Sequence, residues 1–129
     1  MDVSIPNQGL NNMDIDKVLY TLSKSKFRSS FHLRKYMISY IDEKGLDNIK
    51  KHAYDFVTTR LAPKYPKNDG KQTPMKGHPV FIAMHACACC CRNCLEKWHH
   101  LPKERELTSE EVNYIVELLM KWIINEYKR

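Results

Sequence analysis

The sequence predicts an all-α, compact single domain of about five helices with one long basic loop. Apolar residues recur at intervals of three and four along most of the chain, and no segment shows convincing period-two alternation. Thr108 and Glu111 form a T-x-x-E capping box ahead of the last periodic stretch. The 129 residues, 43% of them apolar, suffice for one small core. We therefore expect a helical domain over residues 13–129, preceded by a flexible tail over residues 1–12.

Three helices are expected in the first half of the domain. Asp14 is a candidate N-cap for a short first helix, which a basic connection at residues 27–30 follows. Apolar residues at helical spacing between Leu33 and Ile41 predict a second helix, with Gly45 as its stop. A third apolar stripe predicts a helix over residues 46–61.

Residues 63–77 are the clearest loop in the chain, with three prolines and the turn sequence Asn68-Asp69-Gly70. Four lysines lie in it, and the chain as a whole has a net charge of +6. A basic balance favours phosphate-bearing partners, including nucleic acid, although it also describes an ordinary solvated surface. The expected ligand-binding residues are the cations in and near the loop: Arg60, Lys64, Lys67, Lys71, Lys76 and Arg92.

After the loop, Pro79 suits the first turn of a helix, because its missing N–H has no helical partner there. We expect that helix to continue to about Trp98. The last helix follows Thr108 and carries an apolar stripe as far as Ile123.

All five cysteines lie between Cys87 and Cys94, which is too close together for a disulfide framework. A reducing compartment, the cytoplasm, is therefore expected. On one continuous helix four of these cysteines share the apolar face, and Cys89 lies on the more polar face. Packed core thiols, a metal site and a reactive thiol, for which Cys89 is the best candidate, all remain open.

A zinc site is favoured by the Cys91-x-x-Cys94 spacing and by Cys90 and Cys94 at i, i+4. A single straight helix supplies only two or three ligands to a tetrahedral ion, so another segment must complete the site. His99 and His100 follow closely, and either would complete it by folding back if the helix ends near Leu95; of the two, His99 is taken as the candidate. The candidate ligands of Zn²⁺ are therefore Cys90, Cys91, Cys94 and His99.

Much of the chain between Phe27 and Trp122 resembles a family of small bacterial and phage proteins known only as a domain of unknown function. The resemblance is carried mainly by Asn68-Asp69-Gly70-Lys71-Gln72-Thr73-Pro74-Met75, by Gly77-His78-Pro79-Val80-Phe81, and by Cys90-Cys91-Arg92, Cys94-Leu95 and Lys97-Trp98-His99, with Phe27-Arg28 among the shorter matches. Relatives tend to have Thr at the positions of Cys87 and Cys89, so the resemblance implies that Cys90, Cys91 and Cys94 are the better ligand candidates.

The function that we expect is a small zinc-binding helical protein that binds nucleic acid or another phosphate-bearing ligand through its basic loop. One alternative is a metal-dependent hydrolase of a phosphodiester or nucleotide, with His78, His85 and Asp69 in its catalytic centre. Another is a regulatory adaptor whose cysteines only pack in the core. No membrane association is expected, because the longest nearly apolar run, Val80 to Cys91, is too short to span a bilayer.

Overall fold

The computed structural model describes residues 12–129, and every regular element within that range is helical. The elements are α1 (Asn12–Ser23), the 3₁₀ turn η2 (Arg28–Ser30), α2 (Lys35–Lys44), α3 (Leu46–Phe56), the π-turn η3 (Val57–Leu61), α4 (Pro79–Ala86), α5 (Arg92–His99) and α6 (Ser109–Tyr127). The all-α prediction is confirmed. The predicted tail falls almost entirely on residues 1–11, outside the described residues, and Asp14 lies within α1 rather than at its N-cap.

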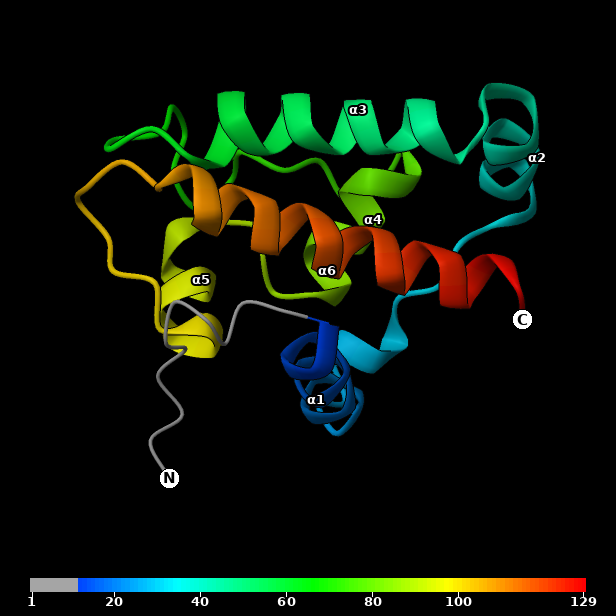
Figure 1. Cartoon of the computed structure of the whole chain (residues 1–129), viewed down its shortest axis with the longest axis horizontal. Helices are drawn as coiled ribbons and strands as arrows, with labels where there is room; N and C mark the ends of the chain where they lie inside the picture. The colour runs from blue at the N-terminus through cyan, green and yellow to red at the C-terminus, as the bar shows by residue number, and fades with distance from the viewer. Residues whose placement is uncertain (1–11) are drawn as a thin grey trace.

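Helix α6 crosses the middle of the molecule, with α3 along one side of it and α1 on the other (Figure 1). Helix α4 packs against both α6 and α3. Four residues of α6 have no exposed surface at all, namely Ile115, Leu118, Leu119 and Ile123. The core is therefore built around α6, and the other helices bury their apolar faces against it.

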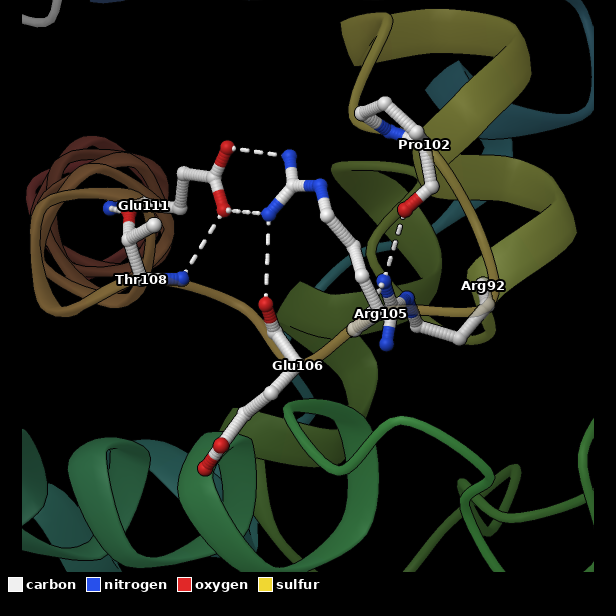
Figure 2. A network of polar contacts seen from close by, with 6 residues as sticks. All are labelled: Arg92, Pro102, Arg105, Glu106, Thr108 and Glu111. Carbon is white, nitrogen blue, oxygen red and sulfur yellow. Dashed lines mark hydrogen bonds and ion pairs between the residues drawn. The ribbon is translucent and has the colours of Figure 1, made fainter.

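The predicted capping box is present at the start of α6. The Thr108 hydroxyl accepts from the Glu111 N–H at 3.1 Å, and the Glu111 carboxylate accepts from the Thr108 N–H at 2.9 Å. Arg105 donates to both oxygens of the same carboxylate, at 2.8 and 2.6 Å (Figure 2). These bonds fix the angle at which the preceding connection enters the helix.

Three other local predictions are also confirmed. Gly45, at φ 82°, ends α2, and its N–H donates to the Ile41 carbonyl. Pro79 is the first residue of α4. The helix expected over residues 46–61 forms over that whole range, although its last five residues wind as η3.

The helix predicted from Pro79 to about Trp98 is wrong as one element, because α4 ends at Ala86 and α5 begins only at Arg92. The N–H of Cys89 donates to the Met84 carbonyl at 2.8 Å, and that of Ala88 to the His85 carbonyl at 3.3 Å. This is a Schellman motif, in which the residue after the helix adopts a left-handed conformation. Ala88 has φ 58° there, at a position where glycine is usual. The end of α4 was not predicted because the sequence has Ala88, and not glycine, at this position.

Candidate metal centre

The turn between α4 and α5 gathers three thiols at one point. The Sγ atoms of Cys90, Cys91 and Cys94 all lie within 4.8 Å of one another, and those of Cys90 and Cys94 are 3.6 Å apart. Cys91 is the N-cap of α5, and its sulfur accepts from the Cys94 N–H at 3.4 Å. Cys90 and Cys91 thus lie just ahead of α5, with their sulfurs beside that of Cys94 in its first turn.

A buried arginine from a distant part of the chain faces this triad. Arg28, in η2, is 9% exposed, and its guanidinium lies 3.1 Å from the Cys94 sulfur and 3.7 Å from the Cys90 sulfur. It also donates to the His85 carbonyl at 2.7 Å. No ion pair with a carboxylate is found for Arg28 among the residues that the structure describes. A buried cation is stable only with an opposite charge or full hydrogen bonding, so the sulfurs are its available anionic partners.

The three thiols differ in how readily each loses its proton, because the pKa values of Cys90 and Cys91 are raised and that of Cys94 is lowered. Hydrogen bonds from Cys90, Cys91 and then Arg28 lower the pKa of the Cys94 thiol well below its usual range. Hydrogen bonds with Cys91 and Cys94 raise the pKa of Cys90 instead, because that thiol acts as a donor. The arrangement thus favours negative charge on Cys94, whose sulfur lies 3.1 Å from the Arg28 guanidinium.

The basic loop is tied to the same turn. The Thr73 hydroxyl donates to the Cys90 carbonyl at 2.8 Å. The His85 Nε2 lies 3.1 Å from the carbonyls of both Thr73 and Pro74, and it carries a proton, because carbonyls only accept. The end of the loop is therefore fastened to the cysteine turn and to α4 by at least three hydrogen bonds.

The two remaining cysteines lie apart from the triad in the core. Cys87 and Cys89 have no exposed surface, and burial raises the pKa of both thiols. Cys89, the best candidate for an exposed, reactive thiol, is therefore buried, and its expected place on the more polar face is wrong. It followed from a continuous helix, whereas the turn after Ala86 directs Cys89 inward.

His99 is not brought to the triad. Its Nε2 donates to the Cys87 carbonyl at 2.8 Å, and its Nδ1 lies 3.0 Å from the Tyr114 hydroxyl. Both ring nitrogens thus have other partners, and the ring is fully buried. Burial lowers the pKa of His99 to about 4, so the ring is neutral at physiological pH.

The three residues considered for catalysis have separate partners. His78 caps α4 by accepting from the Val80 N–H at Nδ1, and its Nε2 faces His52 at 3.1 Å. The carboxylate of Asp69 accepts from the Gln72 side chain at 3.0 Å and lies 3.3 Å from the Arg92 backbone nitrogen. His85 donates to loop carbonyls, as described above. Each of the three side chains thus makes hydrogen bonds that hold the loop or the start of α4 in place.

The predicted cationic residues divide into an exposed and an internal set. Lys64, Lys67, Lys71 and Lys76 are all exposed. Arg60 is half-buried and donates to the Gln72 carbonyl at 2.9 Å. Arg92 is 1% exposed, and its guanidinium donates to four backbone carbonyls, one of them that of Pro102 (Figure 2). The structure thus leaves the lysines, and not Arg92, at the surface.

Sequence reasoning missed Arg28 and Thr73 as neighbours of the cysteines. Arg28 is 62 residues from Cys90, and Thr73 is 17 residues from it. The basic connection at residues 27–30 and the resemblance at Phe27-Arg28 give no indication of a sulfur partner for Arg28.

Comparisons with known proteins give a family and no activity. The model of a domain of unknown function, DUF4186, matches residues 16–124. No solved structure matches the chain. None of the helices within residues 12–129 is both long and apolar enough to cross a membrane.

Proposed function

This chain belongs to the DUF4186 family, and we propose that it is a zinc-binding helical module that binds nucleic acid or another phosphate-bearing ligand through its basic loop. Cys90, Cys91 and Cys94 supply three thiolate ligands to one Zn²⁺. The fourth position then falls to water or to a group on the ligand, because His99 already uses both its nitrogens.

The spacing of the sulfurs is the observation that carries the metal half of this proposal. Two sulfurs bound to one tetrahedral zinc at about 2.3 Å each lie about 3.8 Å apart. The Cys90 and Cys94 sulfurs are 3.6 Å apart, and all three lie within 4.8 Å of one another. Small side-chain rotations therefore suffice to bring the triad onto an ion.

The charge around the triad supports the same assignment. Three thiolates and one Zn²⁺ have a net charge of −1, and the Arg28 guanidinium beside Cys94 neutralises it. Arg28 then acts from outside the ligand set, donating to ligand sulfurs as partners of metal ligands commonly do.

The loop links the metal to the phosphate ligand. Thr73 fastens the loop to the cysteine turn and His85 fastens it to α4, so an ion at the triad restricts the loop that carries the four exposed lysines. Lysines bind phosphate as point charges without reading sequence, so affinity is expected to fall steeply as salt is raised.

The metal half is tested by elemental analysis and zinc titration of purified protein. We expect one zinc per chain, and substitution of Cys91→Ser to weaken zinc binding by at least about tenfold. Cys87→Ser is the matched control, because Cys87 is a neighbouring buried thiol outside the triad. Equal zinc affinity of the two variants would contradict the assignment.

The phosphate half is tested by binding of labelled DNA and RNA over a range of salt concentrations. We expect Lys67→Ala and Lys71→Ala to weaken binding and to reduce the salt slope by about one each. Lys50→Ala serves as the control, because Lys50 lies on α3 and pairs with Glu117. The phosphate-binding role fails if the protein binds neither nucleic acid at low salt.

A further inference from the structure

We propose that the phosphate-bearing ligand is a single-stranded nucleic acid, and that Phe27 stacks on one of its bases beside the cysteine triad. This inference rests on the proposed function and extends it in two respects. It names the class of ligand, and it places part of the binding surface on the connection between α1 and η2, outside the lysine loop.

An unbroken series of contacts joins Phe27 to the end of the loop. The Phe27 and Phe31 rings meet edge to face at 5.1 Å, and Phe31 stacks on His85 at 5.6 Å. His85 in turn donates to the carbonyls of Thr73 and Pro74. Phe27 is thus linked to the loop by two ring contacts, through Phe31 and His85, and by the hydrogen bonds of His85.

The Phe27 ring is largely exposed to solvent although it is fully apolar. Its exposed fraction is 56%, and that of Met75, next to Pro74 in the loop, is 57%. The Arg28 guanidinium lies 5.0 Å from the centre of the Phe27 ring, while its nitrogens contact the sulfurs of Cys90 and Cys94. The ring is therefore held next to the triad by a side chain that is itself fixed.

Exposed lysines stand in both of the chain segments that contribute to this aromatic surface. Lys24 and Lys26 are exposed just before Phe27, and Lys71 and Lys76 are exposed around the loop end that contacts His85. Exposed rings interleaved with lysines are the arrangement that proteins use to bind single strands, where bases stack on rings and phosphates meet cations.

A duplex does not suit this surface. In the interior of double-stranded nucleic acid the faces of the bases are covered by their neighbours, so an exposed phenyl ring finds a free base face only at the two ends. Lysines alone bind single and double strands through the same phosphates. Preference for single strands therefore depends on Phe27 rather than on the loop charge.

The test is fluorescence anisotropy with the full, zinc-loaded chain and two labelled probes, a short mixed-sequence single strand and the blunt duplex of the same sequence. We expect tighter binding of the single strand. Phe27→Leu is expected to weaken single-strand binding by roughly five- to a hundredfold with the salt slope unchanged, and Phe27→Tyr to restore most of it. Tyr65→Leu is the control, because Tyr65 is an exposed loop aromatic outside this series of contacts.

The outcomes separate this inference from the proposed function on which it rests. Equal binding of both probes, or no effect of Phe27→Leu while lysine variants weaken binding, overturns the single-strand assignment and leaves the phosphate role in place. A loss with Tyr65→Leu and none with Phe27→Leu overturns the position of the surface. If neither probe binds, a protein partner is favoured, and the phosphate role fails together with the inference.

Discussion

Acid is expected to destabilise the fold through His99, whose ring is fully buried between α5 and α6. Burial lowers the pKa of this histidine from 6.5 to about 4 in the folded chain. Between these values the unfolded chain binds a proton that the folded chain does not, so the free energy of unfolding falls as the pH falls. The stability that comes from keeping the His99 ring neutral is fully present above pH 6.5 and is lost progressively as the pH falls toward 4.

The size of the effect follows from the same two values. Lowering the pH from about 7 to about 5 favours the unfolded state by about 2 kcal/mol through His99 alone, and the complete loss is about 3 kcal/mol. His78 has a pKa lowered to about 4 as well, but its ring is less buried, so its share is smaller.

Urea denaturation of the metal-free protein at several pH values, compared with that of His99→Gln, measures this contribution. The triad and His78 titrate in both proteins, so the difference between the two pH profiles isolates His99. We expect the variant to be less stable near neutral pH, because it loses the ring's fit between Cys87 and Tyr114, yet to lose about 2 kcal/mol less between about pH 7 and 5. Parallel pH profiles would refute the reasoning.

Three further substitutions test the local architecture, each by the free energy of unfolding in urea. Thr108→Ala removes the cap of α6 and is expected to cost about 1 kcal/mol, with Thr108→Ser close to the original; no difference between Ala and Ser would count against the cap. Arg92→Met leaves four carbonyls without their donor and is expected to cost about 3 kcal/mol or more, whereas a neutral result would mean that water replaces it. His100→Gly relieves a left-handed residue at the end of α5 and is expected to stabilise by about 0.5–1 kcal/mol; a loss would indicate that the His100 side chain contributes contacts.

The parts of the fold that were predictable depend on residues close together in sequence. The Thr108–Glu111 box, Gly45 after α2 and Pro79 at the start of α4 each act within about one helical turn. The end of α4 was missed because an alanine occupies the left-handed position, and burial of the surrounding turn, rather than a local propensity, holds it there.

The candidate site was predictable only in part, for a related reason. The identity of Cys90, Cys91 and Cys94 followed from their spacing and from the resemblance to relatives, but the proposed histidine ligand did not join them. His99 is drawn instead to the Cys87 carbonyl and the Tyr114 hydroxyl. Arg28 reaches the sulfurs across 62 and 66 residues of chain, and no local pattern encodes a contact of that kind.

X-ray absorption spectroscopy at the zinc edge, on protein reconstituted with one equivalent of Zn²⁺, would identify the ligands themselves. We expect three sulfur neighbours at about 2.3 Å and one nitrogen or oxygen neighbour at about 2.0 Å. The sulfur number should fall to two in Cys94→Ser and stay at three in Cys89→Ser. A spectrum without sulfur neighbours, or one that Cys94→Ser leaves unchanged, would contradict a metal centre at Cys90, Cys91 and Cys94.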